Sequence, residues 1–393
     1  MAETAASRGR AGDAPAAAPL RIAWFGHGEG RRADGLSTYS RETVAALRAR
    51  GAQVQTFAHS ADGEGSDTML RGVRLKTLTL SERGAKARVA AELDQLRPDL
   101  VHTSWSFSQL DGAIGRLAHV RGAPAVATFH LPYAAPNSTR GRVLQSLYRY
   151  HVRNLRHYDR CVALSGDQAA LLAAAGYPRH RVTVIANGVD TAAIRPGPSS
   201  LGEELGARFI VAYMGRLDRE KRVPALVRCF LDLGWPGDHV LVIAGGGTQE
   251  HQVRRLAAKA PGRVRLLGVV TDAARRLELL RAADVFVLPS TAEGLALSLL
   301  EAMAAGCAVV ATDAGDDGLA LGDAGVCIGV HPLAPRLREA LQLLREDPQR
   351  RAELGARARQ RVVERYSLQA SVDALLGVYA DLRDGAPVAM GAA

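Results

Sequence analysis

The most informative stretch of the chain is Pro289-Ser-Thr-Ala-Glu-Gly-Leu-Ala-Leu-Ser-Leu-Leu-Glu-Ala-Met-Ala-Ala-Gly306. The segment 284–288 before it is Asp-Val-Phe-Val-Leu, which is apolar and branched enough to predict a buried parallel strand. Residues 297–305 are strong helix formers, and the glycine after them ends the helix. A strand, a tight loop and a helix therefore meet here, with Glu293 in the loop and Glu301 in the helix. The exposed N–H groups of the helix start between them favour an anion such as a phosphate.

The length predicts two domains, because 393 residues are about twice the usual domain size. No apolar run approaches the roughly 18 residues that span a bilayer. We expect a disordered tail over residues 1–19, which are rich in Ala, Gly, Pro and Arg. The turn-forming residues 195–200 predict a hinge, so the expected units are 20–195, 196–365 and a C-terminal helix with its tail over 366–393.

The excess of positive over negative charge is confined to the first half of the chain. Residues 1–195 hold 26 Lys and Arg against 16 Asp and Glu, whereas residues 196–393 hold 24 against 24. The first half is therefore expected to bind an anionic partner. The four cysteines are far apart and lack metal-ligand spacing, which predicts buried free thiols and a reducing, cytoplasmic location. They are Cys161, Cys229, Cys307 and Cys327.

Strand and helix patterns alternate along the chain, which predicts an α/β fold with doubly wound parallel sheets. In the first half the expected strands are residues 20–25, 53–57, 73–77, 100–103, 125–130 and 161–165, and in the second half 209–214, 240–244, 265–270, 284–288 and 308–312. Ligands of such sheets lie beyond the carboxyl ends of the strands. His130, which ends the strand at 125–130, is therefore expected to face a ligand cleft.

The glycine-rich loop after the first strand does not fit a nicotinamide dinucleotide. Gly26-x-Gly28-x-Gly30 places an arginine where the dinucleotide fingerprint needs its third glycine, at position 31. The strand at 53–57 also lacks the terminal acidic residue that would bind a ribose hydroxyl. The loop, which ends at Gly35 before a helix, remains suited to a close backbone approach to a phosphate.

An arginine stripe is predicted on an amphipathic helix over residues 141–160. At 100° per residue five arginines share one face, opposite an apolar face of leucines, tyrosines and Val152. The stripe is either a solvated surface or a site that attracts anionic lipid head groups at the inner membrane face. It consists of Arg142, Arg149, Arg153, Arg156 and Arg160.

The order strand, then Glu-Gly-x-x-Leu-x-Leu-Leu-Glu-Ala-Met-Ala-x-Gly resembles the Glu-x7-Glu signature of glycosyltransferase family 4, retaining enzymes with the GT-B fold. Residues 182–190, which end in Asn-Gly-Val-Asp, resemble the motif that closes the family's first domain. The segment Gly215-Arg-Leu-Asp-Arg-Glu-Lys221 resembles its Gly-Arg-Leu-x-x-x-Lys-Gly. One departure is Glu293-Gly-Leu-Ala296 where Glu-Gly-Phe-Gly is commonest, which narrows the space beside the donor sugar.

The resemblance implies two Rossmann-like domains, with a nucleotide sugar bound by the second domain and an acceptor by the first. It implies that Glu293, Arg216, Lys221 and His130 act on the donor sugar and its diphosphate. It also implies no metal, because two permanent cations would neutralise the leaving diphosphate and the chain has no Asp-x-Asp. The implied donor-binding residues are Gly35, Gly215, Val269, Gly294, Leu295, Ala296, Leu297 and Glu301.

The expected reaction is retaining transfer of a hexose from a nucleoside-diphosphate sugar, with UDP favoured over GDP, to a hydroxyl acceptor that includes lipid-linked candidates. Two alternatives stay open: a nucleotide-sugar epimerase of the same fold, and a nucleotide-sugar binder without activity. The epimerase would yield an isomer without any acceptor. The binder would bind the nucleotide sugar but release no product. The donor sugar, the base and the acceptor are not readable from these residues.

Overall fold

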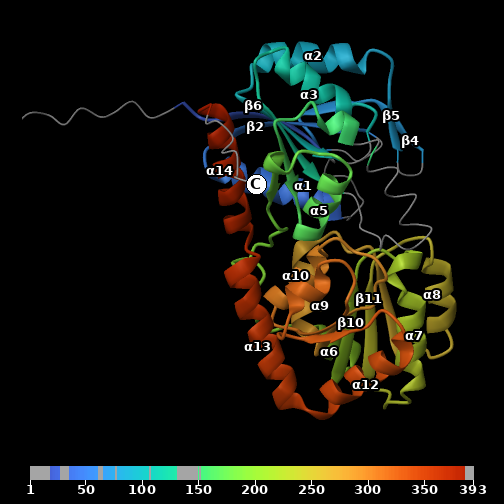
Figure 1. The fold of residues 1–393 in the computed structure, drawn as a ribbon. Coiled ribbons are helices and arrows are strands. Elements are labelled where there is room, and N and C mark those ends of the chain that lie inside the picture. The colour runs from blue at the N-terminus through green and yellow to red at the C-terminus, as the bar shows by residue number, and fades with distance from the viewer. Residues whose placement is uncertain are drawn as a thin grey trace, which may run out of the picture.

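The computed structural model describes residues 18–26, 35–60, 65–75, 78–105, 108–130, 149 and 152–385. Two parallel sheets, each covered by helices, lie one above the other in Figure 1, and the C-terminal helices run along one side of both. This is the predicted pair of parallel-sheet α/β domains. The tail over residues 1–17 and the loop over 27–34 lie outside the described residues.

The first sheet has seven described strands in the order β3-β2-β1-β6-β7-β8-β9, all parallel. The strands are β1 (Arg21–Phe25), β2 (Gln53–His59), β3 (Thr68–Leu70), β6 (Leu100–Trp105), β7 (Ala125–Phe129), β8 (Arg160–Ala163) and β9 (Val182–Val184). The helices that cover them are α1 (Gly35–Ala49), α2 (Ala85–Leu96), α3 (Asp111–His119) and α5 (Gly166–Ala174), and the short η1 (Arg179–Arg181) precedes β9.

Both faces of this sheet are buried, which explains its nearly continuous apolar strands. In β1, Ala23 and Phe25 pack with α2 and α3 on one face. Ile22 and Trp24 pack on the other face with α1 and the C-terminal helix α14 (Leu368–Arg383). The last helix of the chain therefore completes the core of the first sheet.

The strand predicted at residues 73–77 does not join the sheet. Instead β4 (Gly72–Leu75) pairs antiparallel with β5 (Leu78–Ser81) as a separate two-stranded ribbon, and β3 takes the edge position beside β2. The prediction failed because a short apolar run does not reveal its pairing partner. Residues 76 and 77 lie outside the described part of the chain.

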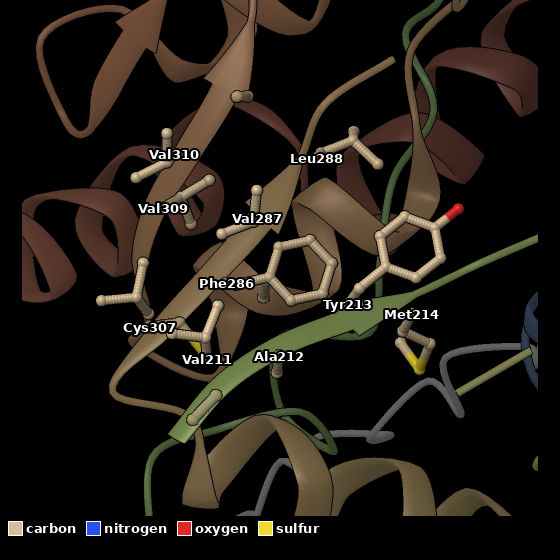
Figure 2. Packing of buried hydrophobic residues seen from close by; sticks show 14 of the residues in the cluster. Val211, Ala212, Tyr213, Met214, Phe286, Val287, Leu288, Cys307, Val309 and Val310 are labelled. Carbon is tan, nitrogen blue, oxygen red and sulfur yellow. The ribbon is translucent and has the colours of Figure 1, made fainter. Parts of the chain in front are cut away.

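The second sheet has the strand order β12-β11-β10-β13-β14-β15 and is parallel throughout. Figure 2 shows side chains of β10, such as Val211 and Tyr213, packed beside Phe286 and Leu288 of β13. Its strands are β10 (Phe209–Met214), β11 (His239–Ala244), β12 (Val264–Gly268), β13 (Val285–Leu288), β14 (Ala308–Thr312) and β15 (Val326–Ile328). Its helices are α6 (Leu201–Leu205), η2 (Arg219–Lys221), α7 (Val223–Asp232), α8 (Glu250–Ala257), α9 (Ala273–Ala282), α10 (Leu297–Ala304), α11 (Asp317–Leu321), α12 (Leu333–Glu346) and α13 (Pro348–Arg365).

Two chain segments cross between the sheets side by side. Val189 N donates to Tyr366 O at 3.0 Å, and Leu368 N donates to Val189 O at 2.9 Å. Arg359 on α13 fastens the crossing, because its guanidinium donates to the carbonyl oxygens of Thr191, Ile194 and Ala304 at 2.6–2.9 Å. The two halves of the molecule are therefore joined through ordered backbone.

The predicted arginine helix ends earlier than expected, at Leu155. Arg160 is the first residue of β8, where it aligns with Val126 of β7, so it does not lie on the helix. Of the other members, Arg149, Arg153 and Arg156 are exposed, while Val152 and Leu155 are buried as the apolar face requires. Arg142 lies outside the described residues.

Three of the cysteines are buried free thiols, but Cys327 on β15 is exposed, so the prediction was wrong for that residue. Throughout the described ranges, every helix is too short or too polar to cross a bilayer.

Candidate active site

The carboxyl ends of the strands in the second sheet carry closely packed glycine loops. A Cβ atom on Gly245, after β11, would lie 1.8 Å from the carbonyl oxygen of Gly215, after β10, and φ of Gly245 is 146°. Only glycine tolerates both conditions. Gly245 N also donates to Gly268 O at 2.6 Å, at the end of β12. These loops present backbone, rather than side chains, to the space above the sheet.

Glu293 lies in the loop after β13 and is buried, with 9% of its side chain exposed. It forms an ion pair with Lys221 of η2, whose side chain is 13% exposed, and it accepts a hydrogen bond of 2.6 Å from Ser290 Oγ. Two of the four residues predicted to act on the donor are thus direct partners, 72 positions apart in the chain. The ion pair allows a carboxylate to remain in this nearly dry position.

A second acid, Asp317, completes this cluster and was missed by sequence reasoning. Its Oδ1 accepts the N–H of Ala296, the residue that precedes α10, at 2.9 Å. Burial, and after it the negative charge of Glu293, raise the pKa of Asp317 well above its usual value. Asp317 therefore holds the start of α10 and tends to remain protonated. The only sequence signal was its place in an acidic turn after β14.

The loop between Glu293 and α10 is anchored from both sides. Asn187, in the segment that leaves the first sheet, donates from Nδ2 to Leu295 O at 3.0 Å. Asp316 N donates to Gly294 O at 2.8 Å, and the side chain of Asp316 accepts a hydrogen bond from Ser165, the residue before α5. The loop is therefore held by residues of the first domain as well as the second. Ala296 and Leu297 are half-buried beside it.

Arg216 follows β10 but does not reach Glu293. It is 53% exposed and pairs with Asp218 and, at 3.1 Å, with Glu220 of its own loop. The phenol of Tyr213 donates to the carbonyl oxygen of Arg216 at 2.7 Å and fixes the backbone there. Arg216 thus lies at the rim of the site, where a diphosphate would have to compete with two carboxylates for it.

Glu301 is buried within α10 and forms an ion pair with Arg276 of α9. Both side chains line a cavity of about 430 Å³ between the two sheets, together with Glu42 of α1. Burial and the charge of Glu301 raise the pKa of Glu42 to about 7. Arg276 and Glu42 had no recognisable signal in the sequence, because their proximity to Glu301 arises from tertiary packing.

On the first sheet, His130 follows β7 and is half-buried, with its ring edge-on to Tyr39 of α1 at 4.6 Å between centroids. Tyr39 continues into a buried hydrogen-bond chain: its hydroxyl lies 3.2 Å from Thr128, which lies 3.0 Å from His102. His102 in turn meets Tyr379 of α14 at 2.7 Å. Burial lowers the pKa of His102 to about 3, so its ring is neutral.

The other predicted residues lie at the edges of this arrangement. Gly35 is the first residue of α1, on the helix that also carries Glu42. Val269 follows β12 and is 52% exposed. Within the described residues, no three His, Cys, Asp or Glu side chains group as metal ligands would.

Solved structures with similar architecture identify the fold. An Anabaena protein, HepE, in complex with UDP and glucose superposes with a TM-score of 0.74 at 18% identity, covering 92% of this chain and 99% of that one. Sucrose-phosphate synthase from Thermosynechococcus elongatus gives 0.74 at 21% identity, over 94% and 100% of the two chains. At this identity the likeness establishes the fold alone, which is the GT-B fold of glycosyltransferases.

The sequence comparisons narrow the class to a family. Residues 33–193 match the model described as Glycosyltransferase Family 4, and residues 203–361 match Glycosyl transferases group 1. A D-inositol 3-phosphate glycosyltransferase of Segniliparus rotundus is 30% identical over 90% of this chain and 86% of its own length. A phosphatidyl-myo-inositol mannosyltransferase of Mycolicibacterium smegmatis is 33% identical over 65% and 64%. The chain belongs to glycosyltransferase family 4.

Proposed function

We propose that this protein transfers a hexose, with retention of configuration and without a metal, from a nucleoside-diphosphate sugar to a hydroxyl group. The observation that carries the proposal is the pair of buried carboxylates, Glu293 after β13 and Glu301 in α10, each with a basic ion-pair partner. Buried ionised groups are costly and are concentrated at functional sites, so these two pairs favour a polar ligand. UDP is favoured as the nucleotide, because structures of the Anabaena neighbour hold UDP.

Each carboxylate suits a different part of the donor. Glu301 can accept hydrogen bonds from two neighbouring ribose hydroxyls, because both oxygens of an ionised carboxylate are acceptors. Glu293 would accept from hydroxyls of the sugar, while Lys221, held beside it, would offer its remaining protons to the diphosphate. The glycine loops after β10 and β11 would let the diphosphate approach backbone, and Arg216 would close over it from the rim.

The proposed reaction needs no protein nucleophile. The bond between the anomeric carbon and the diphosphate oxygen breaks, and its electron pair stays on the diphosphate. The acceptor oxygen bonds to the same face of that carbon, and its proton passes to a phosphate oxygen, which yields the glycoside and a nucleoside diphosphate. Lys221 and Arg216 would stabilise the charge that develops on the diphosphate. His130 would contact the sugar from the first sheet.

The acceptor is proposed to be anionic and bound by the first half of the chain. All the net charge of +10 lies there, and both relatives named above act, by their names, on phosphorylated inositol compounds. A lipid-linked acceptor would bring the exposed Arg149, Arg153 and Arg156 near anionic head groups, each worth about 1 kcal/mol. Loss of vesicle binding in Arg153→Ala/Arg156→Ala, on vesicles containing phosphatidylinositol, would support this location.

Donor binding is tested by calorimetric titration with UDP, GDP, ADP and dTDP and their glucose, mannose and N-acetylglucosamine derivatives, with and without EDTA. We expect one nucleotide to bind regardless of EDTA, and binding to be lost in Glu301→Ala. Glu353→Ala, which changes an exposed glutamate on α13, is the matched control and should bind normally. If none of these compounds binds, the proposed function is wrong.

Catalysis is tested by adding candidate acceptors and following the anomeric proton of the product by NMR. Lys221→Ala should lower turnover about 100-fold to 1000-fold, by analogy with the loss of one oxyanion donor. Lys259→Ala, at an exposed lysine, should not change it. Isomerisation of the donor without acceptor would indicate an epimerase, and donor binding without any product would indicate a binder.

A further inference from the structure

The Glu301 carboxylate already has a cationic partner within the protein. Arg276 pairs with its Oε1, and both side chains are largely buried, at 18% exposure for Arg276 and 4% for Glu301. A guanidinium presents a rigid fork of donors to a carboxylate. A pair of ribose hydroxyls needs the same acceptor oxygens. Arg276 and a bound nucleoside therefore compete for Glu301.

Arg276 has a second acceptor within the same cavity. Glu42 of α1 lines the cavity of about 430 Å³ beside Arg276 and Glu301, and it interacts electrostatically with both. The charged or titratable groups that face Glu42 come from α1, α9, α10 and the segment after β9. They are Arg41, whose guanidinium lies 3.9 Å away, with Arg50, Arg276, Glu301 and Asp190.

Glu42 is only weakly paired, so it can accept Arg276. Arg41 lies 3.9 Å from the Glu42 carboxyl, at the outer limit of an ion pair, and its side chain is 40% exposed, whereas Arg276 is held by Glu301. Burial and the charge of Glu301 raise the pKa of Glu42 to about 7, which leaves it about half protonated at pH 7. Once Arg276 leaves Glu301, a proton on Glu42 is no longer favoured, because a cation then faces it. An unpaired Arg276 would be costly at this depth.

We infer that Arg276 is a latch on the nucleoside site, and that donor binding transfers it from Glu301 to Glu42. The inference rests on the proposed function, since it assigns the ribose to Glu301. In the bound state the ion pair from Arg276 to Glu42 joins α9 of the second sheet to α1 of the first. The same event releases a proton. Glu42 and Arg276 are then positioning residues that determine donor affinity without a contact to the reacting carbon.

Proton release on binding is the first test. UDP-glucose is titrated by calorimetry, with GDP-mannose in parallel, in buffers of equal pH and different ionisation enthalpy. The diphosphate of these probes is substituted at both ends, so it has no proton to lose near neutral pH. We expect release of about 0.9 proton at pH 6, about 0.5 at pH 7 and about 0.1 at pH 8, from a pKa of about 7. Glu42→Gln should abolish the release.

Two substitutions should change donor affinity in opposite directions. Arg276→Gln should tighten binding, by about tenfold if the latch covers Glu301 nine-tenths of the time. Glu42→Gln should weaken it, because the displaced guanidinium loses its acceptor. Circular dichroism checks that both variants fold, and Glu353→Gln is the control.

The outcomes distinguish a failure of the Arg276 latch from a failure of the proposed function. Donor binding without proton release, or weaker binding in Arg276→Gln, would refute the latch and leave the proposed function intact. If neither donor binds, the proposed function fails, and the latch with it.

Discussion

Removing Lys221 should destabilise the second domain strongly, because the buried Glu293 carboxylate would lose its ion-pair partner. Two charges 4 Å apart at an effective dielectric of 20 attract by about 4 kcal/mol. Lys221 and Glu293 are ion-paired with only 13% and 9% of their side chains exposed, so solvent screens the pair little. Breaking a buried pair by deleting one partner costs about 3–5 kcal/mol. Lys221→Met should lower the free energy of unfolding by that amount, because the buried Glu293 carboxylate would lose its cation and remain beside another acid, Asp317.

The double variant Lys221→Met/Glu293→Gln should recover much of the loss, since a neutral amide can keep the hydrogen bond from Ser290 without an unpaired charge. Hydrogen exchange of peptides from β10 and β13, measured across a urea series, reports the second domain separately from the first. Lys259→Met is the exposed control. The reasoning is refuted if the single-variant losses add within about 0.5 kcal/mol in the double variant, because independent sites behave that way.

Three further predictions concern residues that anchor the site. Tyr379→Phe should destabilise the first domain by about 1–3 kcal/mol, because His102 Nδ1 loses its 2.7 Å partner, and exchange in β6 and β7 would measure this; an unchanged rate would contradict it. Asp317 has a raised pKa, so the folded state keeps its proton longer than the unfolded chain and stability falls as pH rises from about 4. In Asp317→Asn the midpoint of urea unfolding should fall less steeply with rising pH than in the parent protein. An equal slope in the two proteins would argue against this role of Asp317. Asn187→Ala should weaken nucleotide binding about fivefold, since the hydrogen bond that holds the Leu295 carbonyl is worth about 1 kcal/mol; equal affinity by calorimetry would refute this.

The strand-loop-helix around Glu293 was predictable because its signals are local. The predicted strand at 284–288 and helix at 297–305 correspond to β13 and α10 within one residue at each end. Burial on both faces demands apolar strands, and a glycine ends the helix, so neighbouring residues carry the information. The same reasoning located His130 directly after β7.

Elements that depend on distant partners were predicted less well. The helical periodicity of the sequence predicted that Arg160 lies on the arginine helix. It begins β8 instead, because hydrogen bonding to β7 outweighs the helical preference of its segment. Residues 73–77 had a strand pattern, but nothing in the sequence indicated that β4 would pair with β5 and not join the sheet beside β2. Periodicity describes a segment, whereas sheet membership is a property of two segments.

The partners of the charged residues were also hidden from the sequence. Lys221 and Arg216 were both predicted to clamp a diphosphate, but Lys221 pairs with Glu293 and Arg216 with the carboxylates of its own loop. Arg276 lies 25 positions before Glu301, on another helix, so nothing in the sequence connects them. Tertiary packing determines which acid each basic residue pairs with. It therefore also determines which ion pair a bound ligand would have to break.

The two ion pairs differ in a way that predicts different responses to one donor. A lysine ammonium has three protons that can point in different directions, so Lys221 can keep Glu293 and still donate to a diphosphate. The guanidinium of Arg276 is planar and rigid, and in the proposed donor complex Glu301 would use both of its oxygens for two ribose hydroxyls. In that complex the first pair would persist, whereas the second would break. Because only the second exchange involves the partly protonated Glu42, the pH dependence of donor binding should follow Glu42 and be insensitive to Lys259→Ala, and a dependence that survives Glu42→Gln would mean that another group titrates.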